Sequence, residues 1–320
     1  MLASAIMHFY FIGVTTRQSA MARILPLWAE ALAIELDLVG VDLPLDASSA
    51  QYQKAVLDIK NDSKALGALI TTHKLKLYEH AANLFDEFDA LAKYTKEVCA
   101  IKMQGHRLFG SAMPDCMANV DSLKSMLDAN FWHQHKSDVL CFGAGGAALS
   151  IVLSLLCDFE SSSPLTTKQI YKPQKIFLVD INQERLQSTH DLLEPLRDGV
   201  EIEYICQSKA ELNDQLLAGR PIGSLIINAT GMGKDRPGSP LTDAAYFPLQ
   251  SVIWELNYRG ERLFLKQAKS QEHSRELYIH DGWLRFLYGW TQTLQLVLQK
   301  KFTFEQFEQL VKIAEAFRTN

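Results

Sequence analysis

Hydrophobic residues along this chain fall into short runs that alternate with longer amphipathic stretches, almost from one end to the other. In the first part of the chain, five such runs predict buried strands, at residues 8–14, 38–45, 67–71, 97–102 and 107–111. Helices are predicted at 19–36 and at 120–129. Strands that alternate with helices in this way indicate an α/β fold with mainly parallel sheets.

A second α/β series follows. Its predicted strands are the runs that begin at Asp138 and Lys175 and the segments 201–206, 224–230 and 251–258. Residues 158–174, with three consecutive serines and two prolines, predict a loop insertion. Two helices are expected at the end, at 283–299 and 303–317, and Thr303 with Gln306 forms a candidate capping box.

The length supports two domains, because 320 residues exceed the usual size of one compact core. We expect a substrate-binding α/β domain at 1–120, with the C-terminal helices 284–320 packing back on it. A Rossmann dinucleotide-binding domain is expected at 121–283, so that the two domains flank a cleft.

Composition narrows the function classes. A hydrophobic content of 48% argues against disorder, and a net charge of -5 disfavours a nucleic-acid or anionic-membrane partner. No apolar run reaches the length of a membrane span. The five cysteines lack CxxC spacing, which disfavours a disulfide framework or zinc site and favours the reducing cytoplasm. His133 and His135 lie in a polar linker, and no metal site is predicted.

A glycine-rich turn is the strongest chemical signal. It directly follows an apolar strand and opens an apolar helix, which is the context that a dinucleotide-binding motif needs. Its glycines permit a tight turn and a close approach of the backbone to a diphosphate, which helix N-terminal amides bind. The predicted cofactor-binding residues here are Gly143, Ala144, Gly145, Gly146 and Ala147.

Asp180 ends the next predicted strand. A carboxylate at this position binds the adenosine ribose and repels a 2′-phosphate, so it favours NAD over NADP. It lies 37 residues after Gly143, whereas about 20 is usual, and the 158–174 insertion accounts for most of the excess. The alternative is that Asp180 only caps the following helix. Arg185 lies a turn into that helix and does not outweigh the acid.

A polar turn closes a later strand, at the sheet edge where the nicotinamide half of a dinucleotide lies. Its candidate cofactor-binding residues are Asn228, Ala229, Thr230 and Met232. The alternative is an ordinary turn from strand to loop.

Together, the glycine turn, the sequence Ile226–Gly233 and the late helical segment Gly289–Gln292 resemble the shikimate/quinate dehydrogenase family. In the first part of the chain, Gly67–Lys74 matches the family's lysine segment, and Gly110–Asp115 matches its segment Gly-x-Asn-Thr-Asp. The resemblance extends over nearly the whole chain.

The resemblance implies a catalytic pair, Lys74 and Asp115. Oxidation of a secondary alcohol needs a proton acceptor, and a lysine desolvated in a cleft can have its pKa lowered towards neutrality. We therefore expect Lys74 to act as general acid and base, and Asp115 to orient it and bind a substrate hydroxyl. Without the resemblance, Lys74 would be interpreted as a surface lysine.

Departures from the family pattern lie in the substrate pocket. The family's Asn and Pro in the lysine segment are replaced by Ala68 and Thr72, and a substrate-binding Asn is replaced by Cys99. Hydroxyl-binding pockets discriminate strongly when a partner is missing, so shikimate itself is doubtful as the substrate. By the resemblance, the candidate substrate-binding residues are Ser19, Thr71, Tyr258 and Gln292.

The sequence thus predicts an NAD- or NADP-dependent dehydrogenase that acts on a small-molecule ring compound with hydroxyl groups, for which a carboxylate is also expected. Two alternatives stay open: the same fold acting on an amino-acid-like or folate-like substrate, and a non-catalytic NAD-binding sensor. A homodimer is one assembly that the sequence leaves open.

Overall fold

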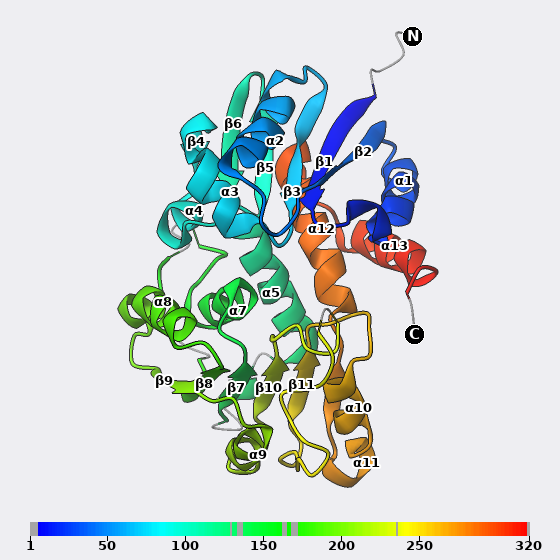
Figure 1. Ribbon diagram of the computed structural model, residues 1–320. Helices are drawn as coiled ribbons and strands as arrows, with labels where there is room; N and C mark the ends of the chain where they lie inside the picture. The colour runs from blue at the N-terminus through cyan, green and yellow to red at the C-terminus, as the bar shows by residue number, and fades with distance from the viewer. Residues whose placement is uncertain are drawn as a thin grey trace. The chain divides into compact units, whose positions relative to one another are not determined.

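The protein is described here from a computed structural model, which covers residues 6–128, 130–132, 137–161, 165–167, 172–234 and 236–318. The chain divides into two compact units (Figure 1). Unit 1 comprises Met1–Met117 and Leu287–Arg318, and unit 2 comprises Ala118–Phe286 and Thr319–Asn320. The divisions fall within two helices, α5 (Met113–Met126) and α12 (Trp283–Leu298). The predicted α/β class is confirmed.

Unit 1 is built on a six-stranded mixed sheet with the order β2-β1-β3-β5-β6-β4. Its strands are β1 (Met7–Gly13), β2 (Leu36–Asp42), β3 (Ala65–Ile70), β4 (Glu87–Phe88), β5 (Ala100–Gln104) and β6 (Arg107–Ser111). Its helices are α1 (Met21–Ala31), α2 (Ser49–Asn61), α3 (Lys74–Ala81), α4 (Ala90–Thr95) and α13 (Phe304–Glu315), with short 3-10 turns η1 (Thr16–Gln18) and η2 (Ala82–Leu84). β1 is parallel to β2 and β3, whereas β5 is antiparallel to β3 and β6.

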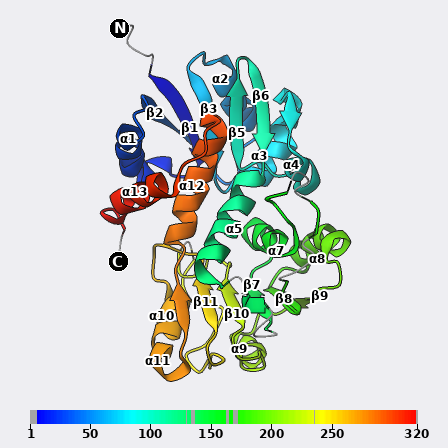
Figure 2. The same ribbon diagram turned by 180° about the vertical axis from the view of Figure 1, so that it is seen from behind.

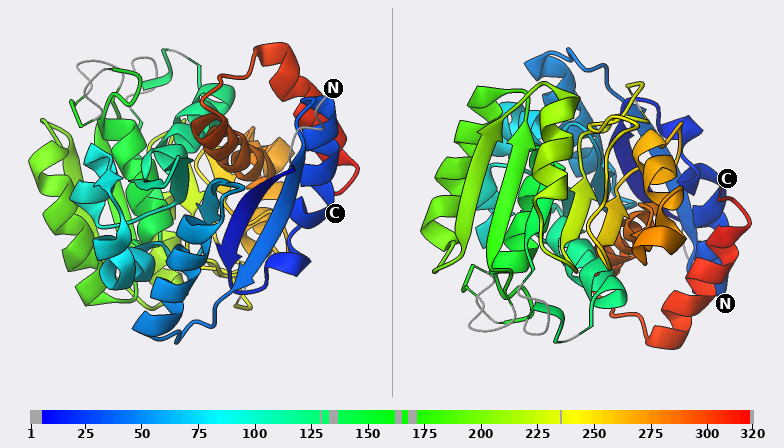
Figure 3. Two further views of the ribbon diagram at one scale, coloured as in Figure 1. Left: turned by 90° about the horizontal axis from the view of Figure 1, so that it is seen from above. Right: turned by 90° about the horizontal axis from the view of Figure 1, so that it is seen from below.

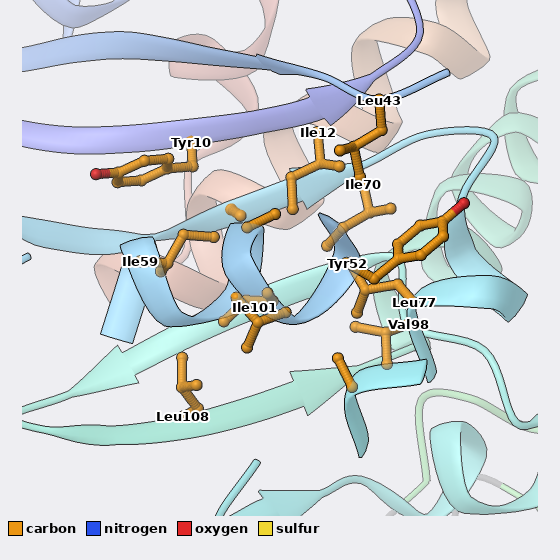
Figure 4. Close-up of a cluster of buried hydrophobic side chains, with 14 of the residues drawn as sticks. Tyr10, Ile12, Leu43, Tyr52, Ile59, Ile70, Leu77, Val98, Ile101 and Leu108 are labelled. Atoms are coloured by element: carbon orange, nitrogen blue, oxygen red, sulfur yellow. The ribbon is translucent and has the colours of Figure 1, made fainter. Parts of the chain in front are cut away.

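Apolar side chains cover both faces of this sheet. On one face, Tyr52 and Ile59 of α2 pack with Ile12, Ile70 and other sheet residues in a buried cluster (Figure 4). On the opposite face, the ring of Phe11 packs edge to face against Trp290 of α12, with ring centroids 4.9 Å apart. The sheet is therefore a rigid support for the loops at its carboxyl edge.

Helices α1 and α13 lie side by side in unit 1 (Figure 2). The buried indole of Trp28 donates a hydrogen bond to the carbonyl of Leu310, 2.8 Å away. The predicted capping box forms at Thr303, whose side chain accepts from the amide of Gln306. The final helix is thus fixed both at its start and along its packed face.

Unit 2 contains a six-stranded parallel sheet with the order β12-β11-β10-β7-β8-β9 (Figure 3). Its strands are β7 (Val139–Phe142), β8 (Lys175–Asp180), β9 (Glu201–Cys206), β10 (Leu225–Asn228), β11 (Val252–Glu255) and β12 (Tyr278–His280). Its helices are α7 (Gly146–Leu156), α8 (Gln183–Leu193), α9 (Ala210–Ala218), α10 (Leu263–Lys269) and α11 (Glu272–Arg275), with the 3-10 turn η3 (Glu194–Leu196). Strand order reverses at β7, which places a switch point between β7 and β10, where dinucleotides bind in such sheets.

The structure differs from the predicted secondary structure in several places. The helix expected at 120–129 begins at Met113, because Pro114 is compatible with the first turn of a helix and does not stop it. Asp115 consequently lies in that first turn, where the helix dipole favours a carboxylate. Strands β4 and β12 are not among the predicted strands, since two and three residues give too short a hydrophobic pattern. None of the helices in the described ranges is both long and apolar enough to cross a membrane.

Candidate functional site

Lys74 and Asp115 form an ion pair in unit 1, in which the Lys74 ammonium donates a hydrogen bond to Asp115 Oδ2. Lys74 is the first residue of α3 and Asp115 lies in the first turn of α5, so two helix starts bring the pair together. The side chains are 24% and 21% exposed. The pair is therefore largely shielded and still reachable by a ligand.

The turn before Lys74 is held in an unusual backbone conformation. Thr72 has φ of 61°, in the left-handed region that a β-branched residue rarely adopts. His73 is 2% exposed, and its ring nitrogens bond to the Tyr52 hydroxyl and the Leu43 carbonyl, at 2.8 and 2.9 Å. A buried anchor thus compensates for local strain and fixes where α3 begins. Strain of this kind gathers at functional sites.

The charge state of Lys74 differs from the expectation. Burial lowers the pKa of its ammonium, but Asp115, with smaller contributions from Cys99 and Glu97, raises it more, so the net shift is upward. The expected lowering towards neutrality is therefore wrong. The reason is that a carboxylate in direct contact stabilises the ammonium and outweighs its desolvation. At neutral pH the pair is Lys⁺–Asp⁻, the state in which Lys74 can donate a proton.

Glu97 is a site residue that the sequence did not reveal. Its half-buried carboxyl lies close enough to Lys74 and Asp115 to interact electrostatically with both. Burial is the largest cause of its raised pKa. The charge of Lys74 lowers this pKa, and the charge of Asp115 raises it. Among the described residues it has no hydrogen-bond partner. Cys99, two residues on, is buried, and burial raises the pKa of its thiol well above the ordinary value. The one sequence feature that could have pointed to Glu97 is its position as an acidic residue shortly before an apolar strand.

The other candidate substrate-binding residues of unit 1 are Ser19, Thr71 and Gln292. Ser19 Oγ accepts a hydrogen bond from the Met21 amide at the start of α1. Thr71 directly follows β3, and its hydroxyl is 3.5 Å from the Ile12 carbonyl. Gln292 lies half-buried on α12. In the described ranges no cluster of His, Cys, Asp or Glu could hold a metal ion, and His133 and His135 lie outside those ranges.

In unit 2, the glycine turn joins β7 to α7 as predicted. Gly143 has φ of 106°, and a Cβ there would lie 2.8 Å from the Ala229 carbonyl, so only glycine lets the turns after β7 and β10 approach this closely. Gly145 is the N-cap of α7, and amides of the first helical turn have no partner within the helix. The turn thus provides a cradle suited to a diphosphate.

Asp180 ends β8 and braces this turn. Its Oδ2 accepts from the Ala144 amide at 2.8 Å and its Oδ1 from the Asn182 amide at 3.0 Å. Arg185 also reaches it, with Nη1 3.2 Å from both oxygens. The side-chain cap of α8 is Asn182 rather than Asp180. The carboxylate therefore lies at the turn and not only at a helix end.

A hydrogen-bonded network shapes the turn after β10. Asn228 donates to Glu255 Oε2 at 2.8 Å, while its own Oδ1 accepts from the Thr230 hydroxyl at 2.7 Å. Asn257 donates from its backbone amide to Glu255 Oε1 at 2.9 Å and from its side chain to the Met232 carbonyl at 2.9 Å. The candidate cofactor-binding residues 228–232 are thus held by the end of β11.

Glu255 is fully buried, and desolvation raises its pKa to about 7 in spite of these hydrogen bonds. Because the folded-state pKa exceeds the ordinary value of 4.5, the folded protein binds more protons than the unfolded chain between about pH 4.5 and 7. The contribution of Glu255 to stability is therefore present at low pH and is lost as the pH rises through 7.

We predict that the free energy of unfolding of Glu255→Gln, compared with that of the unsubstituted protein, changes with pH. The variant loses stability at pH 5, because its amide meets a hydrogen-bond donor, and this deficit shrinks by up to about 3 kcal/mol by pH 8. Urea unfolding at several pH values measures the difference. A deficit that is constant with pH would contradict a titrating Glu255.

Tyr258, the remaining predicted residue, follows β11 and stacks on Phe286, with ring centroids 4.4 Å apart. Phe286 in turn stacks on Trp283, at 5.5 Å. Trp283 is only 2% exposed, so it supports this aromatic cluster from within.

No model of a known protein family matches the chain. A curated shikimate dehydrogenase (NADP(+)) of Streptococcus gordonii is 24% identical to it over 276 residues, which span 85% of each protein. The structure of quinate dehydrogenase from Corynebacterium glutamicum in complex with NAD is similar, with a TM-score of 0.70 and 16% identity over 97% of this chain and 98% of that one. The structure of 5-ketofructose reductase from Gluconobacter sp. strain CHM43 is also similar, with a TM-score of 0.66 and 15% identity over 97% of this chain and 99% of that one.

Proposed function

We propose that the chain is an NAD(P)-dependent dehydrogenase, because its sequence is similar to those of curated shikimate dehydrogenases and its fold to that of a quinate dehydrogenase. Its reaction interconverts a secondary alcohol and a ketone on a hydroxylated, carboxylated ring compound. The observation that carries this proposal is the shielded ion pair of Lys74 and Asp115 at the start of two helices.

The cofactor fits the residues of unit 2. The glycine turn leaves no room for a Cβ at Gly143, and the start of α7 offers free amides to a diphosphate. Asp180 would bind the adenosine ribose, which favours NAD over NADP. When bound, the nicotinamide ring accepts or donates a hydride. The residues proposed to hold the cofactor are Gly143, Ala144, Gly145, Gly146, Ala147, Asp180, Asn228, Ala229, Thr230 and Met232.

In the mechanism, Lys74 moves the proton of the substrate hydroxyl. Because Lys74 is charged at neutral pH, it is ready to protonate the oxygen of a ketone as that ketone is reduced. Alcohol oxidation needs the neutral amine, so it is favoured by alkaline pH. Asp115 orients Lys74 and accepts a hydrogen bond from a substrate hydroxyl. Ser19, Thr71, Tyr258 and Gln292 are proposed as further substrate contacts.

Glu97 favours one alternative substrate class. A carboxyl near Lys74 that has no hydrogen-bond partner in the described part of the chain attracts a hydroxyl or an ammonium group and repels a carboxylate. A hydroxy amino acid, whose ammonium group could meet Glu97, is therefore a second candidate substrate.

The test is a substrate screen with NAD and NADP, followed at 340 nm. The panel contains ring hydroxy acids such as shikimate and quinate, neutral polyols, and hydroxy amino acids. We expect NADH formation with a ring hydroxy acid. Turnover of hydroxy amino acids alone would support the second candidate, and tight NADH binding without turnover of any compound would indicate a cofactor-binding sensor.

A further inference from the structure

Arg285 is an arginine of α12 whose guanidinium is held from one side. Its Nε donates to Asn119 Oδ1 at 2.6 Å, and both residues belong to unit 2. Within the described parts of the chain, the Arg285 side chain makes no other hydrogen bond, and no carboxylate forms an ion pair with its guanidinium. The terminal nitrogens Nη1 and Nη2 therefore keep their donors available to a ligand.

The residue that holds Arg285 is completely buried. Asn119 is 0% exposed, and its side-chain amide donates to Ser150 Oγ at 2.9 Å. The Ser150 hydroxyl donates in turn to the Ala147 carbonyl at 2.9 Å. Three consecutive hydrogen bonds thus connect Arg285 to the first turn of α7, where the candidate diphosphate site lies. A buried polar chain is costly unless each group is satisfied, and here it fixes the position of one charge.

Other charges near the start of α12 are already paired. Asp281 accepts from the Trp283 amide at 3.0 Å and lies 3.5 Å from Arg262 Nη1. Next to Arg285, Phe286 stacks on Tyr258, the aromatic residue proposed to contact substrate. Arg285 is thus a half-buried cation that is linked by hydrogen bonds to α7 and is adjacent in sequence to Phe286 of this aromatic cluster. Guanidinium donors of this kind bind carboxylate or phosphate oxygens strongly.

We propose that Arg285 is an anion-binding residue of this site, held in place by Asn119, and that it contacts a phosphate or carboxylate group of a bound ligand. The proposal rests on the dehydrogenase function proposed above and adds a contact to it. The anion has two sources, the cofactor diphosphate or the carboxylate of the substrate, and both offer the same oxygen chemistry.

Two variants separate the charge from the tether. Arg285→Gln keeps an amide that can donate to Asn119 and removes the charge, whereas Arg285→Lys keeps the charge. Arg197→Met is a matched control, since it removes an exposed arginine of unit 2 that pairs only with Glu194 among the described residues. Circular dichroism and thermal unfolding show whether each variant is folded.

The first arm titrates each protein with NADH and follows the nucleotide fluorescence. If the diphosphate is the anion, Arg285→Gln raises the Kd for NADH about 10- to 100-fold, as expected for one charge-assisted hydrogen bond. Arg285→Lys recovers part of this loss, and the loss in the Gln variant decreases at high salt. The control changes the Kd by less than twofold.

The second arm uses the carboxylated alcohol that the screen identifies, together with its methyl ester. If the substrate carboxylate is the anion, Arg285→Gln raises KM for the acid and leaves KM for the ester unchanged. Unchanged values in both arms, for a protein that binds NADH and turns over, overturn the proposal while the dehydrogenase function stands. A wild-type protein that neither binds NADH nor oxidises any compound overturns both.

Discussion

Replacing Lys74 with methionine is expected to lower kcat by two to four orders of magnitude, the range that a general acid or base contributes. Methionine keeps the length and apolar stem of lysine but can neither donate nor accept the proton. The Kd for NADH should stay the same, because the proposed cofactor-binding residues all belong to unit 2. Steady-state rates at 340 nm and a fluorescence titration measure the two quantities.

Lys76→Met is the matched control, since Lys76 lies on the same helix and donates from an exposed position to the Leu45 carbonyl. It should leave kcat within about twofold. The raised pKa of Lys74 also fixes the direction of the pH profile. Alcohol oxidation should become faster towards alkaline pH, and ketone reduction slower. A kcat of Lys74→Met close to that of the control would remove Lys74 from the mechanism.

The second large effect is expected at Asp180. Asp180→Asn removes the charge that repels a 2′-phosphate and weakens the hydrogen bond to the ribose. It also releases Arg185, now paired with Asp180, to bind a phosphate. We expect the Kd for NADH to rise about tenfold and that for NADPH to fall about tenfold, a change of about 100-fold in preference.

Asp191→Asn provides the comparison, because Asp191 is an exposed acid of α8. Titration of each variant with NADH and NADPH gives the ratio directly. If Asp180→Asn leaves the preference unchanged, the carboxylate serves only to brace the Ala144 amide and the proposed role in cofactor choice fails.

Local signals carried the prediction of the cofactor unit. The glycine turn, Asp180 and Asn228 each lie at a strand end that the hydrophobic pattern locates, so their place at the sheet edge follows from the order of strands and helices. The structure confirms the α/β arrangement behind that prediction. The roles of these residues in binding a cofactor stay predictions.

Contacts between residues far apart in the chain could not be predicted from local sequence patterns. Lys74 and Asp115 are 41 positions apart, and the resemblance to a family, rather than any spacing, paired them. The sign of the Lys74 pKa shift depends on the partner in direct contact, which no sequence pattern gives. Arg285 and Asn119 are 166 positions apart, and Glu255 titrates near neutrality only because it is fully buried. Burial and partners at this range come from tertiary packing.

In the proposed reaction, a hydride passes between the carbinol carbon of a ring alcohol and the nicotinamide. This transfer is tested most directly with the alcohol identified by the screen, deuterated at its carbinol carbon. After incubation with the wild-type protein and NAD, mass spectrometry of the nucleotide should show one deuterium for each NADH formed. A protein that binds NADH but transfers no label from any alcohol in the panel would not be a dehydrogenase of this kind.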